Sequence, residues 1–75
     1  PVELAFQGRL LRGTPDGQVH ESRDDGKTWQ KTADFGSQCA VQALLERGGL
    51  VYAKISLRNF SFLLKSADAQ VWRTA

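Results

Sequence analysis

An internal repeat constrains the fold of this chain more than any other feature of its sequence. The segment Ser22–Trp29 reads SRDDGKTW and Ser66–Trp72 reads SADAQVW, with the serines 44 and the tryptophans 43 residues apart. Upstream of these segments, Gly8–Leu11 corresponds to Gly48–Val51. Two copies nearly fill a chain of 75 residues. The fold should therefore consist of two similar units, as in repeat architectures.

Each copy divides into four short runs of strand-forming residues separated by turn residues. The expected strands are 2–7, 9–14, 18–22 and 29–32 in the first copy, and 40–46, 50–56, 60–66 and 71–74 in the second. Segment 38–47 could also form a helix, but the symmetry of the copies favours a strand. The sequence predicts an all-β fold of two four-stranded antiparallel units, residues 1–37 and 38–75, in one domain.

The alternation within the expected strands indicates which faces are buried. Val2, Leu4 and Phe6 share one face of the first strand, as a period of two residues requires. In the second copy, strand 50–56 is apolar on both faces, and we expect Phe60 to lie in the core. Strands that are apolar on both faces indicate a sheet sandwiched between two others, as in the inner blade of a β-propeller.

Composition excludes several classes of protein. Ten basic and eight acidic residues give a formal charge of +2, spread along the chain without the basic stripe of a nucleic-acid binder or the apolar run of a membrane protein. Cys39 and His20 are the only cysteine and histidine, so neither an internal disulfide nor a four-ligand zinc site is expected. The free thiol and the lack of signal-peptide features favour a cytoplasmic or already processed protein.

The first repeat segment resembles the Asp-box, or bacterial neuraminidase repeat, which forms a hairpin turn in the blades of sialidases and other β-propellers. The residues that carry the resemblance are Ser22, Asp24, Gly26, Thr28 and Trp29. An Asp side chain can accept hydrogen bonds from turn amides, and glycine adopts a positive φ without a steric penalty. The tryptophan offers an apolar body to pack beneath the hairpin, with an N–H that needs a partner.

The second segment keeps only part of this pattern. Ser66, Asp68 and Trp72 are present, but the segment is one residue shorter, and Gln70 and Val71 stand where the first copy has glycine and threonine. We therefore expect a different turn in the second copy. The resemblance implies that the chain contributes two propeller blades and that the box residues are structural.

The resemblance to sialidase repeats does not extend to catalytic residues. Sialidase-like catalysis needs an arginine cluster, a Tyr–Glu nucleophile pair and an aspartic acid from several blades, whereas Tyr52 is the only tyrosine here. We expect no catalytic residues, no metal and no cofactor. His20 is expected to be satisfied or solvent-facing, and Cys39 to be a small buried hydrophobic residue.

Two blades are too few to close a propeller, which typically has four to eight. We therefore expect a homo-oligomer, with a trimer of six blades favoured, and keep a monomeric barrel or sandwich as an alternative. The predicted function is a non-catalytic binding module, with a carbohydrate as one candidate ligand and Asp16, Gln38, Arg58 and Asn59 as candidate contacts. The alternatives are a glycan-acting hydrolase whose site forms between chains and a pure assembly scaffold.

Overall fold

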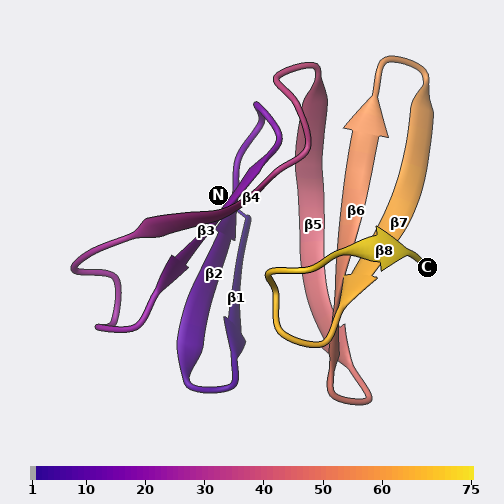
Figure 1. The fold of residues 1–75 in the computed structure, drawn as a ribbon. Coiled ribbons are helices and arrows are strands. Elements are labelled where there is room, and N and C mark those ends of the chain that lie inside the picture. The colour runs from indigo at the N-terminus through magenta and orange to yellow at the C-terminus, as the bar shows by residue number, and fades with distance from the viewer. Residues whose placement is uncertain (1) are drawn as a thin grey trace.

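The computed structural model describes residues 2–75 and confirms an all-β architecture. The chain forms two four-stranded antiparallel sheets in which the strands follow chain order (Figure 1). Sheet 1 contains β1 (Val2–Phe6), β2 (Arg9–Gly13), β3 (Gln18–Ser22) and β4 (Gln30–Asp34). Sheet 2 contains β5 (Cys39–Arg47), β6 (Leu50–Leu57), β7 (Phe60–Ser66) and β8 (Arg73–Thr74).

Most expected strands lie within two residues of the observed ones, and the ambiguous segment 38–47 is strand β5. The ranges expected for β3 and β7 match at both ends. The largest differences are two residues, at the end of β4, which is expected at residue 32 and lies at Asp34, and at the start of the last strand, which is expected at residue 71 and lies at Arg73. The second repeat segment occupies the intervening residues as a bend, so β8 pairs only with Leu64 and Lys65 of β7.

The up-and-down order places the connections at two opposite ends of the sheets. The β1–β2 and β3–β4 hairpins, together with the β5–β6 and β7–β8 hairpins, lie at one end, which holds both repeat segments (Figure 1). The β2–β3, β4–β5 and β6–β7 connections lie at the other end (Figure 1). We refer to these as the box end and the loop end of the molecule.

The core lies between the two sheets, and β5 packs against β1, β2 and β3. Its buried side chains come from both halves of the chain and are Phe6, Leu11, Val19, Cys39, Val41, Leu44, Val51, Ala53, Ile55 and Ala69. Phe60 was expected in this core, and that prediction is wrong because its side chain is 73% exposed. It lies beside the β6–β7 turn, and sheet 1 does not cover it there.

The sheets stack in the same sense, so that the front of one meets the back of the other. Ser22 and Ser66 begin the two repeat segments, which we call the box segments, and pair with Leu10 and Val51, which makes these two partners equivalent. The alignment of Gly8–Leu11 with Gly48–Val51 expected from the sequence is therefore wrong by one residue, because the two-residue hairpin turns place Arg9 opposite Phe6 and Leu50 opposite Arg47. Val51 is fully buried toward sheet 1, whereas Leu10 lies on the side of sheet 1 that faces away from sheet 2. We call the facing sides of the sheets inner and the opposite sides outer.

Two glycines allow the close approach of the sheets. A Cβ atom on Gly13 of β2 would lie 2.3 Å from Val41 Cγ1 of β5, which is far inside van der Waals contact. At the loop end, a Cβ on Gly17 would lie 2.2 Å from the carbonyl oxygen of Gly36 in the β4–β5 connection and 3.0 Å from that of Cys39 in β5. The backbone N–H of Val41 donates to the carbonyl of Thr14 at 3.0 Å, so a main-chain bond also joins the halves.

Substitution of Gly13 by alanine should test this packing directly. We expect Gly13→Ala to destabilise the protein by about 1–3 kcal/mol, the usual effect of overpacking a core. In a Val41→Ala background the same substitution should cost less, because the nearest methyl group is gone. Urea unfolding of the parent protein, the two single variants and the double variant measures this coupling, and equal costs in both backgrounds would contradict the proposed contact.

Candidate functional site

The first box segment is a turn held by the side chains of Ser22, Asp24 and Thr28. Asp24 Oδ1 accepts hydrogen bonds from the Thr28 backbone N–H and the Ser22 hydroxyl, both at 2.8 Å. Asp24 Oδ2 accepts from the Thr28 hydroxyl at 2.6 Å. The Ser22 hydroxyl oxygen in turn accepts from the backbone N–H of Gly26 at 2.8 Å. The carboxylate therefore holds the turn together from its centre.

The backbone of this turn explains the glycine and the tryptophan. Asp25 and Gly26 have φ values of 62° and 90°, in the left-handed region that glycine adopts most easily. The indole N–H of Trp29 donates to the Gly26 carbonyl at 3.0 Å, and the indole ring lies beneath the glycine. The turn and the first residue after it thus form one compact unit.

The second box segment forms a related but shorter turn. Asp68 Oδ1 accepts from the backbone N–H groups of Gln70 and Val71 at 3.0 and 3.1 Å, and from the Ser66 hydroxyl at 3.0 Å. Only Ala69 has a positive φ, 63°, where the first turn has two such residues. The turn differs from the first as its missing residue requires, yet its Ser and Asp side chains have the same hydrogen-bonding roles.

Trp72 differs from Trp29 in how its indole is used. Its Nε1 is buried and has no hydrogen-bond partner within residues 2–75. Its ring packs edge-on against Phe35, which follows β4, with centroids 5.8 Å apart. Trp72 therefore joins the second box segment to sheet 1 through an aromatic contact.

Hydrogen bonding lowers the pKa of both box aspartates. The Thr28 hydroxyl and backbone N–H hold the pKa of Asp24 at about 2, and the backbone N–H groups of Gln70 and Val71 hold that of Asp68 at about 2. Both carboxylates are therefore ionised near neutral pH and committed to their turns. A general acid needs a proton to donate near working pH, so neither residue fits that role.

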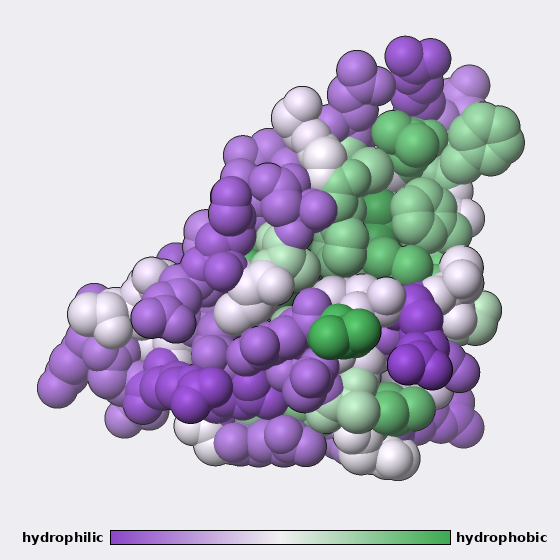
Figure 2. Space-filling view, viewed as in Figure 1, coloured by the Kyte–Doolittle hydropathy of each residue, from purple (hydrophilic) through white to green (hydrophobic). Residues whose placement is uncertain are grey.

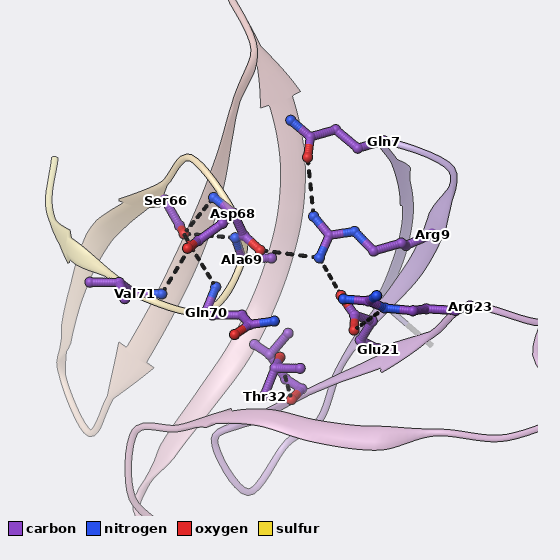
Figure 3. Close-up of polar contacts among 11 residues, drawn as sticks. Gln7, Arg9, Glu21, Arg23, Thr32, Ser66, Asp68, Ala69, Gln70 and Val71 are labelled. Atoms are coloured by element: carbon purple, nitrogen blue, oxygen red, sulfur yellow. Dashed lines mark hydrogen bonds and ion pairs between the residues drawn. The ribbon is translucent and has the colours of Figure 1, made fainter.

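An arginine links the second box segment to sheet 1. Arg9 Nη1 contacts Glu21 Oε1 and also donates to the Asp68 carbonyl at 3.2 Å (Figure 3). Glu21 is 2% exposed and also accepts from Arg23 Nε at 3.0 Å. Burial alone would raise the pKa of Glu21, but hydrogen bonds from Arg23 and Arg9 outweigh burial and lower it. The ion pair therefore holds a buried charge where the second box segment meets sheet 1. We call this set of contacts among Arg9, Glu21 and the Asp68 carbonyl the junction.

The candidate ligand residues lie at the loop end but on separate connections. Asp16 is in the β2–β3 turn, Gln38 in the β4–β5 connection, and Arg58 and Asn59 in the β6–β7 turn. All four are exposed. The main hollows of the molecule are lined by other residues. The loop end therefore supplies polar groups without a pocket that gathers them.

The remaining reactive side chains have structural surroundings. Cys39 is buried in the core, as expected. His20 is half-buried, with Nε2 3.0 Å from Gln18 Oε1. Residues 2–75 contain no group of three or more His, Cys, Asp or Glu side chains placed to hold a metal ion. Within the same residues, no helix has the length and hydrophobicity needed to cross a membrane.

The outer face of sheet 1 is mostly polar, with Leu10 and the Trp29 ring as apolar parts, and its polar side chains pair with one another. Arg12 donates to Glu3 Oε2 across β1 and β2 at 2.8 Å and stacks over the Trp29 ring at 4.2 Å. His20 and Gln18 lie on the same face and are hydrogen-bonded to each other. This arrangement suits a face in water, like that of the capping units that end repeat proteins.

The outer face of sheet 2, which we call the open face, has a different character. Leu45 and Leu63 are each 45% exposed on either side of Tyr52, and these three residues with Arg47 line a hollow of about 390 Å³. In the equivalent register, Tyr52 corresponds to Leu11, which is fully buried in sheet 1. Sheet 2 therefore exposes a face whose counterpart in sheet 1 is buried.

Sequence reasoning identified the box residues but missed the two features that organise the molecule. Arg9 gave no motif signal, because its contact with Asp68 spans 59 residues and depends on how the sheets stack. The open face was partly visible, since Leu50 and Tyr52 alternate with Val51 and Ala53. What the alternation could not show is which of the two faces is covered.

Comparisons with known proteins add no relative. No protein-family model, curated protein or solved structure matches this chain.

Because Asp24 holds its turn together, its loss should lower the thermal stability more than the loss of Asp16. Asp24→Ala should lower the thermal midpoint by several degrees, because two backbone or hydroxyl donors of Thr28 lose their acceptor. Asp16→Ala removes an exposed turn carboxylate for which no hydrogen bond is present in the described chain, and should change the midpoint little. Calorimetry of both variants checks this expectation, and equal midpoints would contradict it.

The two arginines that pair with Glu21 should differ in how much each contributes to the free energy of unfolding. Arg9 is 12% exposed and Arg23 is 69% exposed. Arg9→Ala should destabilise the protein by about 3 kcal/mol, because it leaves Glu21 buried with one partner and frees the Asp68 carbonyl. Arg23→Ala should cost less than about 1 kcal/mol, as for exposed pairs. Urea unfolding measures both, and the reverse order would refute the junction.

Proposed function

We propose that this chain is a non-catalytic interaction module made of two propeller-type blades that binds a partner protein through the open face. The observation that supports this proposal most is that the open face of sheet 2 is equivalent to the buried inner face of sheet 1. Sheet 2 packs over that inner face of sheet 1, whereas no sheet packs over Leu45, Tyr52 and Leu63. Exposed apolar patches of this kind mark interaction sites more often than ordinary surface.

The chemistry of the acidic residues supports binding rather than catalysis. Asp24 and Asp68 are ionised and bonded within their turns, and Glu21 is paired with two arginines. Tyr52 lies in the hollow with Leu45, Leu63 and Arg47, without an acidic residue in the lining that could act as its base. A hydrolase would need such a pair within hydrogen-bond reach.

Closure of a ring by copies of this chain would bury charged side chains, which opposes it. A head-to-tail ring brings the outer face of sheet 1 against the open face of the next copy. That contact would bury the Glu3–Arg12 pair and His20 close to Lys54 and Lys65. In addition, Lys54 stands where sheet 1 has Gly13, the residue that permits close approach. We therefore favour a different protein as partner over the homotrimer.

The proposal predicts where small apolar probes gather on the protein. Titration with isopropanol, followed by ¹⁵N–¹H spectra, should shift the amides of Leu45, Tyr52 and Leu63 most, because interaction surfaces concentrate apolar binding energy. Clustering of shifts at the exposed Phe60 and Phe62 would contradict the choice of face. Shifts with oligosaccharides at Asp16, Gln38, Arg58 and Asn59 would favour the lectin-like alternative instead.

A solution mass and an activity assay complete this test. Light scattering should give a single chain, and a stable mass of three chains would restore the ring. Turnover of fluorogenic glycosides that Tyr52→Phe abolishes would overturn the non-catalytic function.

A further inference from the structure

Charge is distributed unequally between the two halves of the molecule. Residues 1–37 carry five basic and six acidic side chains, and residues 38–75 carry five basic and two acidic ones, a formal −1 against +3. The ion pairs found in residues 2–75 all lie in the first half. The second half therefore holds positive charge that the chain itself does not neutralise.

The two carboxylates of the second half are engaged within their own turns. Glu46 Oε2 accepts from the Gly49 backbone N–H at 3.0 Å. Asp68 accepts from its own turn, as described above. Neither is within ion-pair distance of a basic side chain among the residues described. The basic side chains are thus available to an outside partner.

Four of the five basic residues in this half surround the open face. Their places follow from the strand register, in which Arg47, Lys54, Lys65 and Arg73 lie on the same side of sheet 2 as Tyr52. Arg47, Lys54 and Arg73 are exposed. Lys65 and Arg73 are direct cross-strand neighbours, and like charges in that position repel each other unless an anion lies between them.

The apolar centre and charged rim together resemble the anatomy of a protein interface. Such interfaces have a desolvated core rich in aromatic residues and a polar rim. Here Tyr52 lies between Leu45 and Leu63 at the centre, with basic side chains around them. A nucleic acid or a sulfated sugar would use the cations, but it would leave the leucines without an apolar partner.

We propose that the open face binds an acidic protein segment whose apolar side chains pack on Tyr52, Leu45 and Leu63 while its carboxylates pair with the basic rim. This inference rests on the proposed function and specifies its partner. Three strands of about eight residues give a face of roughly 400 Å². Counted over both partners this is roughly 800 Å², below the standard size of stable specific interfaces, so the complex should be transient, with a Kd on the order of 10–100 μM.

The test uses a short fluorescein-labelled peptide in which glutamates alternate with leucine and phenylalanine. Anisotropy should show saturable binding to the intact chain, and the same peptide with lysine in place of glutamate should not bind. Lys54→Glu should weaken binding about tenfold, since like charges then oppose each other. Lys27→Glu changes the net charge equally but lies in the first box turn, so it should leave binding unchanged.

A second pair of variants tests the apolar centre. Leu63→Ser should weaken binding about tenfold, because the peptide loses a central apolar contact. Phe60→Ser removes a more exposed apolar side chain from the loop end and should have little effect. Dispersion of the ¹⁵N–¹H spectrum confirms that each variant is folded, so a loss of binding cannot be attributed to unfolding.

Three results would overturn the inference. Equal binding of single-stranded DNA or of phosphatidylglycerol vesicles, unaffected by Leu63→Ser, would make the face a general polyanion surface. Binding of the peptide that Lys54→Glu leaves unchanged would place the site elsewhere. Absence of peptide binding, while isopropanol still gathers at Tyr52, would refute the acidic partner but leave the interaction surface itself in place.

Discussion

The packing of β5 against a glycine of sheet 1 is the contact on which the rest of the structure depends. Val41 can approach β2 only because Gly13 has no side chain, and the core forms around this contact. A domain of this size has a marginal core. A second link adds to it, the ion pair of Arg9 with Glu21 and the hydrogen bond of Arg9 to the Asp68 carbonyl. Figure 2 shows a largely hydrophilic first half of the chain beside a hydrophobic area over the loop-end parts of β6 and β7.

The same stacking makes the two outer faces unlike, although the two sheets share one strand order. The position that is apolar on the inner face of sheet 2 at Ala53 is polar on the outer face of sheet 1, where Arg12 stands in its place. The open face has an apolar centre around Tyr52. One end of the stack therefore presents mostly polar, paired side chains and the other an apolar centre, and the proposed function rests on this asymmetry.

The sequence predicted local structure well and long-range contacts poorly. The fold class and the ends of β3 and β7 follow from alternation and from Ser22 and Ser66, since each serine begins a turn that ends its strand. The exposure of Phe60 could not be predicted, because alternation gives the face of a residue but not how far the opposite sheet extends. Arg9 was missed for a related reason, as its partner Asp68 becomes a neighbour only after stacking.

Nuclear Overhauser contacts between the two sheets test the central claim, the same-sense stacking of the sheets, most directly. The account predicts contacts from the Val41 methyl groups to the α-protons of Gly13 and to Val2, because these groups meet between the sheets. Contacts from Val41 to Leu10 or Trp29 would instead place sheet 2 on the opposite face of sheet 1. That result would contradict the stacking and, with it, the identity of the open face.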